Sequence, residues 1–147
     1  MATTRLTETD LRVFLMDKPE LNTLIAGQRW SSEDIEQAEL FVVDYFNIMN
    51  PPTMPGWTLE SFPYRALLLI GTAAHLLKSA AINEASNQFS YSADGVQVND
   101  KDKAQVFTAM GEAYWTEFKQ LAQGIKINFN IAGCFGTQHS EYIYRLR

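Results

Sequence analysis

Histidine and cysteine are the residue types of this chain best suited to chemistry, and each one stands alone. The chain contains two histidines, His75 and His139, and one cysteine, Cys134. Neither histidine lies in a spacing such as HExxH, which would place a second metal ligand one helical turn away. A nucleophilic cysteine would need a base and a lowered pKa. We therefore interpret His75 as a core or interface histidine, His139 as a surface or contact residue and Cys134 as a small hydrophobic residue.

Two acidic runs could imitate a metal site. Glu33, Asp34, Glu36 and Glu39 follow one another closely, but acids in the first turn of a helix are what the helix dipole favours. Residues 99–102 lack the glycine and the glutamate of a calcium-binding loop. No GxSxG elbow, P-loop or GxGxxG stretch occurs. We predict no catalytic residues, no metal, no cofactor and a non-enzymatic protein; a small helical enzyme with a polar pocket stays an alternative.

Composition favours one ordinary globular domain. The 147 residues are 46% hydrophobic and carry a net charge of −5 with scattered Lys and Arg. Direct nucleic-acid binding, or a regulator with a basic reading helix, would need a basic stripe. The first ten residues do not resemble a secretory signal, and one cysteine excludes an intrachain disulfide, so we expect a cytoplasmic setting. The apolar run 66–77 is too short to span a bilayer and is predicted to be a buried helix.

Caps and apolar periodicity predict about four helices. The first covers residues 7–16, and a short helical turn follows at 19–26. The next helix begins at Ser31 or Ser32 and ends near 47–50, before the proline-rich connector 51–57. Ser61 is predicted to cap the third helix, which continues to about residue 85 and is apolar nearly all round, hence central. The last helix begins at 99 or 100 and carries a heptad-like seam from Phe107 to Ile125.

Alternating side chains predict β-structure in two places. Residues 89–98 alternate on either side of Asp94-Gly95, which predicts a β-hairpin. Residues 126–132 place Ile127, Phe129 and Ile131 on one face, which predicts a strand that must pair with the hairpin or with another subunit. The glycine- and aromatic-rich tail 133–147 either folds back on the core or docks on a partner, and both options stay open.

The predicted fold is mainly α: a bundle of about four helices with a β-hairpin and a C-terminal strand or extended arm. Residues 1–132 form the single helical domain and residues 133–147 the arm. The apolar and aromatic side chains of the hairpin, strand and arm exceed what one subunit is expected to bury, so they and the hairpin turn are candidate interface residues. These residues are Tyr91, Asp94, Gly95, Val96, Phe129, Ile131, Phe135, Tyr142 and Tyr144.

Residues 65–144 resemble the small head–tail connector, or neck adaptor, proteins of tailed bacteriophages. The resemblance is carried by RALLLIGTAAHLLKSAAINEA, FSYSADGVQVN, DKDKAQVF and INFNIAGCFGTQHSEY. It implies a virion structural protein, assembled in the host cytoplasm, that forms a homo-oligomeric ring with an expected twelvefold symmetry. Its partners would be the portal protein and a tail or second neck protein, with DNA passing through the channel without sequence-specific binding and no membrane involved. Another capsid or tail protein of the same virion is the alternative.

Overall fold

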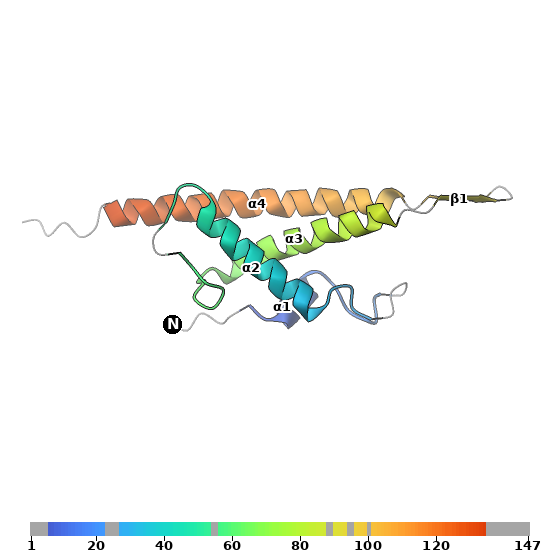
Figure 1. Cartoon of the computed structure of the whole chain (residues 1–147), viewed down its shortest axis with the longest axis horizontal. Coiled ribbons are helices and arrows are strands. Elements are labelled where there is room, and N and C mark those ends of the chain that lie inside the picture. The colour runs from blue at the N-terminus through green and yellow to red at the C-terminus, as the bar shows by residue number, and fades with distance from the viewer. Residues whose placement is uncertain are drawn as a thin grey trace, which may run out of the picture.

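The computed structural model describes residues 6–22, 27–53, 56–87, 90–93, 96–99 and 101–134, with the backbone alone for 90–93, 96–99, 101, 102 and 134. The described chain is mainly helical, as predicted. Its helices are α1 (Glu8–Phe14), α2 (Ser32–Ile48), α3 (Arg65–Ser86) and α4 (Lys101–Cys134). Figure 1 shows α4 lying along the whole length of the body, with α3 beside it and α2 crossing them.

The starts of α1 and α2 are fixed by local hydrogen bonds that the sequence predicts. Thr7 and Asp10 form a capping box at α1, and Ser31 and Asp34 form a second one at α2. In each box the hydroxyl and the carboxylate satisfy backbone N–H groups that have no partner inside the helix. Of the helical turn predicted at 19–26, residues 19–21 form a turn in which the N–H groups of Leu21 and Asn22 both donate to the carbonyl of Lys18, and residues 23–26 lie outside the described residues.

α3 is the central helix, as its all-round apolar character predicts. It packs against α2 on one side and α4 on the other, and its seam with α4 is the more extensive one. The helices are tightly packed at Gly71, where an added Cβ would lie 2.6 Å from Val42 Cγ1 and 2.9 Å from Phe118 Cδ2. Glycine is therefore required for α2, α3 and α4 to meet at this point.

The start of α3 differs from the prediction. Ser61 does not cap the helix: its backbone N–H and hydroxyl bond to Thr58 instead. The helix begins at Arg65 after Tyr64, whose side chain makes no capping hydrogen bond. Pro63 lies before the helix, and the preceding residues form a separate turn because Thr58 and Ser61 satisfy each other.

α3 is also the one helix in the described ranges that is long and apolar enough to cross a bilayer. Length and composition alone give this result, and core helices of soluble proteins pass the same test. In this chain 56% of the most apolar window of α3 is buried inside the structure. The interpretation of residues 66–77 as a buried helix is therefore confirmed.

The strand predicted at 126–132 is wrong, because these residues belong to α4, which continues to Cys134. Alternation of Ile127, Phe129 and Ile131 suggested a period of two, yet the side chains that face the body are Ala122, Lys126 and Asn130. Their spacing of four is helical. Two of the three are polar, so a count of apolar residues could not detect the helical face.

The other β-prediction is described in part, whereas most of the arm lies outside the described residues. β1 (Ser90–Ala93) and β2 (Val96–Asn99) pair antiparallel, with Ser90 opposite Asn99 and Ala93 opposite Val96. The turn on which the predicted hairpin depends, Asp94-Gly95, lies outside the described residues, so the hairpin stays a prediction. Residues 133 and 134, predicted as the first of the arm, end α4 instead. Residues 135–147 lie outside the described residues.

Candidate assembly surface

The structure locates four of the nine predicted interface residues. Phe129 and Ile131 lie on α4, where they are 41% and 48% exposed. Tyr91 and Val96 belong to β1 and β2, for which only the backbone is described. The other five are outside the described residues: Asp94, Gly95, Phe135, Tyr142 and Tyr144.

The exposure of Phe129 follows from the relative lengths of α3 and α4. The two helices are antiparallel, since Gly71 faces Phe118 and Gly111 faces Ala74. α3 begins at Arg65, so α4 has no α3 beside it for about its last ten residues. Figure 1 shows this end of α4, in red, extending beyond the other described elements. We call residues 127–131, with Ile127, Phe129 and Ile131 exposed, the apolar end of α4.

The stripe that α4 buries in the body continues into this unsupported part. Phe118 and Ala122 are completely buried and Ile125 is partly buried against the same cluster. Phe129 follows Ile125 by four residues and therefore points the same way. It is nevertheless exposed, because α3 begins at Arg65 and does not lie beside this part of α4. An apolar helix face that extends beyond the part of the subunit that covers it is a surface suited to another protein chain.

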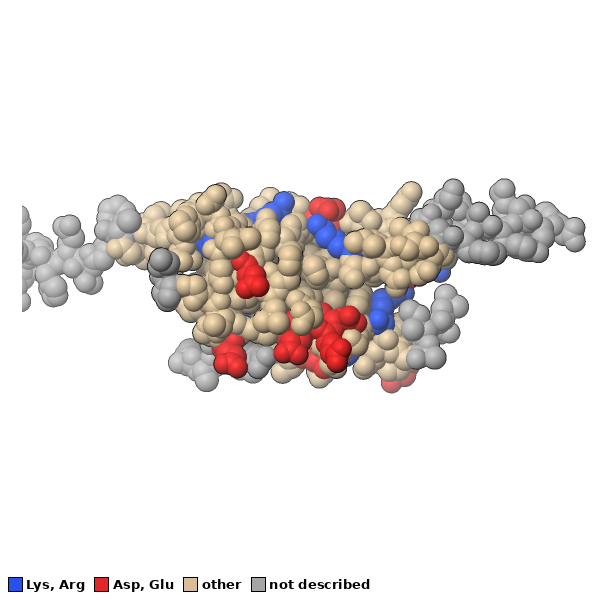
Figure 2. Space-filling model, in the orientation of Figure 1, with Lys and Arg blue, Asp and Glu red and all other residues tan. Residues whose placement is uncertain are grey.

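Charge is also missing from this part of the surface. Between Gln120 and Cys134 the sequence has one charged residue, Lys126, and that residue is fully buried. Figure 2 shows this end of the molecule almost without charged side chains, whereas acidic side chains gather on the side of α2. Depletion of charge in an exposed helix is typical of the centre of a protein interface.

Lys126 is a structural residue that the sequence did not reveal. Its ammonium donates hydrogen bonds to the backbone carbonyls of Met49 and Asn47 and lies 5.0 Å from the ring centre of Phe46. These carbonyls belong to the end of α2, which has no basic residue in its own last turn. Lys126 therefore supplies the positive charge that the end of α2 favours. Burial lowers the pKa of this ammonium.

Lys126 also fixes where the apolar end of α4 lies relative to the body. One turn further on, Asn130 donates to the carbonyl of Pro52 at 3.1 Å. The two polar side chains thus attach α4 to the connector that follows α2. A lone charge in an otherwise apolar stretch was the available signal, but its partner is 77 residues away and could not be inferred.

Replacing Lys126 with Met should lower the free energy of unfolding by about 1–3 kcal/mol, because two helix-terminal carbonyls lose their donor inside the protein. The apolar stem of Lys126 is retained by Met, so packing changes little. Lys119→Met, on an exposed position of the same helix, is the control and should change stability by less than about 0.5 kcal/mol. Urea unfolding followed by circular dichroism measures both, and equal midpoints would contradict the assigned role.

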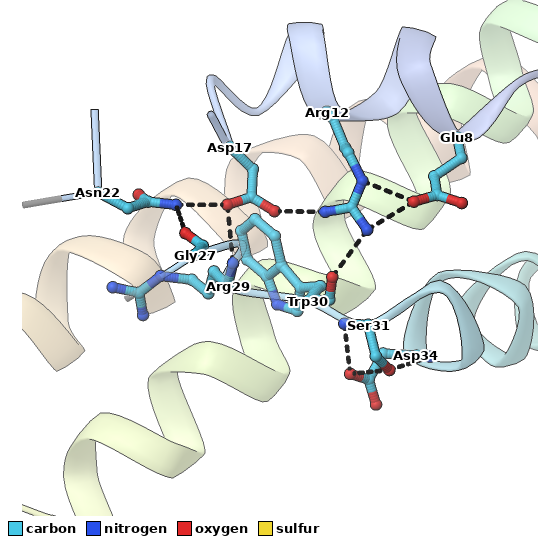
Figure 3. Close-up of polar contacts among 9 residues, drawn as sticks. All are labelled: Glu8, Arg12, Asp17, Asn22, Gly27, Arg29, Trp30, Ser31 and Asp34. Atoms are coloured by element: carbon cyan, nitrogen blue, oxygen red, sulfur yellow. Dashed lines mark hydrogen bonds and ion pairs between the residues drawn. The ribbon is translucent and has the colours of Figure 1, made fainter. Parts of the chain in front are cut away.

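A second feature is a cluster of polar groups that orders the segment between α1 and α2 (Figure 3). The Arg12 guanidinium donates to Glu8 at 2.7 Å, to Asp17 at 2.8 Å and to the carbonyl of Trp30 at 2.9 Å. Asp17 also accepts from the Asn22 amide and the Arg29 backbone N–H, each at 2.8 Å. Arg12 and Asp17 are both buried. We call this set the Arg12 cluster; its donors and acceptors bond mainly to one another, as expected of a structural network.

An open pocket lies beside the Arg12 cluster. Its volume is about 390 Å³, and we call it the α1 pocket. Its polar wall comes from the Arg12 cluster, and its charges are paired: Arg12 with Asp17, and Arg29 with Glu84 at 2.9 Å. The remaining lining is mostly apolar and consists of Phe14, Leu15, Met16, Trp30, Leu77, Phe107, Met110 and Tyr114. The pocket therefore suits an apolar side chain better than a charged ligand.

Asp10 ties α1 to the start of α3 and gives a prediction about pH. Its carboxylate bonds to Thr7 and lies 2.6 Å from the Arg65 guanidinium, which together lower the pKa of Asp10 from 3.8 to about 2. Because the folded pKa is below the unfolded one, this carboxylate stabilises the fold above pH 3.8, and that stabilisation is lost as pH falls through about 2. NMR titration of the Asp10 carboxyl should give a midpoint near 2; a midpoint near 3.8 would contradict it.

His75 is partly buried on α3, in keeping with its interpretation as a core or interface histidine. Its ring packs against Phe41 in a tilted arrangement with centroids 4.4 Å apart, and burial, followed by the nearby Lys78, lowers the pKa of its imidazole. Within the described ranges no group of three or more His, Cys, Asp or Glu side chains is placed to hold a metal ion. The side chains of Cys134 and His139 are outside the description.

Comparison with known proteins gives no matching family model, no matching curated protein and no matching solved structure.

Proposed function

We propose that this protein is a non-enzymatic virion structural protein of a tailed phage, the adaptor subunit of an oligomeric head–tail connector ring. One observation carries the proposal. Beyond the start of α3, α4 continues as an exposed segment in which Phe129 prolongs the buried stripe, Ile127 and Ile131 lie on the opposite face, and no charge is exposed. A chain built in this way gains stability by covering that segment with another chain.

The setting in a phage neck rests on the resemblance of residues 65–144. In the proposed ring the predicted hairpin around Asp94-Gly95 contacts a neighbouring subunit or the next ring. The segment 135–147, with Phe135, Tyr142 and Tyr144, docks on the portal protein or on a tail or second neck protein. The net charge of −5 suits a channel through which DNA slides without binding.

Immunogold labelling of purified virions tests this placement. An antibody raised against the full chain should label the head–tail junction of particles made by a phage that encodes it. Label on the capsid shell or along the tail would favour the alternative, another structural protein of the same virion. Particles that carry the chain nowhere would overturn the proposal.

The ring is tested separately on the purified protein. Native mass spectrometry over a range of concentrations should show complexes of many copies of the 16.7 kDa subunit, and negative-stain images should show closed rings. A monomer at every concentration, also with the portal protein present, would contradict the ring.

A further inference from the structure

We propose that subunits associate head to tail, with the apolar end of α4 of one copy seated in the α1 pocket of the next copy. This inference rests on the proposed homo-oligomer and specifies its contact. It assigns two different surfaces of one chain to the two sides of a single interface. The occupant of each surface is thus a second copy of this chain.

The first argument is charge. Two copies each carry a net charge of −5, and the acidic side chains gather on the side of α2 (Figure 2). Copies therefore repel one another through that side. The apolar end of α4 has no exposed charge, and the α1 pocket has its charges paired internally by Asp17 and Glu84. These two surfaces can approach each other without leaving a charge unpaired.

The second argument is distance. Met110 of the pocket and Phe129 of the apolar end lie on the same helix, nineteen residues apart, which is about 28 Å at 1.5 Å per residue. A straight helix cannot bring its own end into its own pocket. Figure 1 shows the apolar end of α4 at one end of the body and α1 near the middle of the long axis. A contact between two such different surfaces is heterologous, which is the type that generates rings.

The third argument is the backbone at the rim of the pocket. Met16 follows the last turn of α1 with φ +54°, and the N–H of Asp17 donates to the carbonyl of Arg12 at 2.9 Å. This is the αL helix end at which glycine is usual, and a larger residue there is strained. Met16 is nevertheless 57% exposed, so its side chain gains little from the fold of its own subunit. Strain of this kind is typical of positions retained for binding.

Mixing two defective variants tests the contact. Phe129→Glu damages the apolar end and leaves the pocket intact, whereas Met110→Glu does the reverse. Each variant alone should be a monomer, and an equimolar mixture should give a dimer of one copy of each, with twice the 16.7 kDa subunit mass. Ile82→Glu, at an equally apolar exposed position of α3 outside both surfaces, should assemble like the unmodified chain.

Other outcomes overturn the inference without touching the proposed function. If the unmodified chain assembles and Met110→Glu assembles equally well, the apolar ends pair with each other and not with the pocket. If both variants are monomers and the mixture gives no dimer, another surface forms the interface. A chain lacking residues 135–147 that loses assembly entirely would show that the tail, and not the apolar end, makes the contact.

Met16→Gly tests the pocket with a substitution that is not expected to impair folding. Glycine relieves the strain at the end of α1, so the melting temperature should stay the same or rise. Removal of the exposed side chain from the pocket rim should nevertheless weaken association by roughly tenfold or more. Unchanged association with unchanged stability would contradict the role of the pocket.

Discussion

Replacing Arg12 with Met is expected to lower the free energy of unfolding by about 3 kcal/mol. Removing one partner of a buried ion pair costs about 3–5 kcal/mol, because the remaining charge stays buried without its counter-ion. Here the remaining charge is Asp17, whose side chain is 1% exposed. We expect the lower end of the range, since Asp17 keeps the Asn22 amide and the Arg29 N–H as donors.

The Arg12 prediction has a matched control and an internal test. Arg65→Met breaks the ion pair with Asp10, in which the Arg65 side chain is 44% exposed, and should cost less than about 1 kcal/mol. Adding Asp17→Asn to Arg12→Met removes the unpaired charge and should recover part of the loss. Urea unfolding measures the four proteins. If Arg12→Met costs no more than Arg65→Met, the Arg12 cluster does not stabilise the segment between α1 and α2.

Replacing Phe118 with Ala is the second substitution with a large expected effect, a loss of about 3–5 kcal/mol. Phe118 is fully buried where α2, α3 and α4 meet, against the backbone of Gly71 and beside Val42. It also stacks on Trp115 with ring centroids 5.0 Å apart. The space left behind is bounded by three helices that cannot all move inward, so a cavity remains. The free-energy cost of this cavity is added to the transfer free energy lost with the buried ring.

Phe41→Ala is the control for Phe118, since Phe41 contacts the same aromatic group but is 43% exposed. The loss of the Phe41 side chain should cost clearly less, because a large part of its surface is already in contact with water before the substitution. Thermal unfolding by calorimetry measures both variants. A cost for Phe118→Ala that equals the cost for Phe41→Ala would mean that the three helices close around the deleted ring.

Much of the fold could be predicted from the sequence because its determinants are local. The capping residues Thr7 and Ser31 lie within three residues of the N–H groups that they satisfy, so the starts of α1 and α2 are visible in the chain itself. The apolar run 66–77 and the predicted seam from Phe107 to Ile125 show a helical period directly. One member of that seam, Leu121, is 46% exposed in the structure. These features can be predicted without knowing which helix packs against which.

The tertiary structure alone decided the features on which the proposed assembly depends. Lys126 bonds to carbonyls at the end of α2, Arg12 binds Trp30, and Asn130 binds Pro52; each of these contacts joins distant parts of the chain. Residues 126–132 alternate like a strand, yet they are helical because Lys126 and Asn130 face the body. Whether Phe129 is core or surface depends on where α3 begins. A sequence fixes which residues share a helix face, but the lengths and positions of neighbouring helices determine which part of that face is covered.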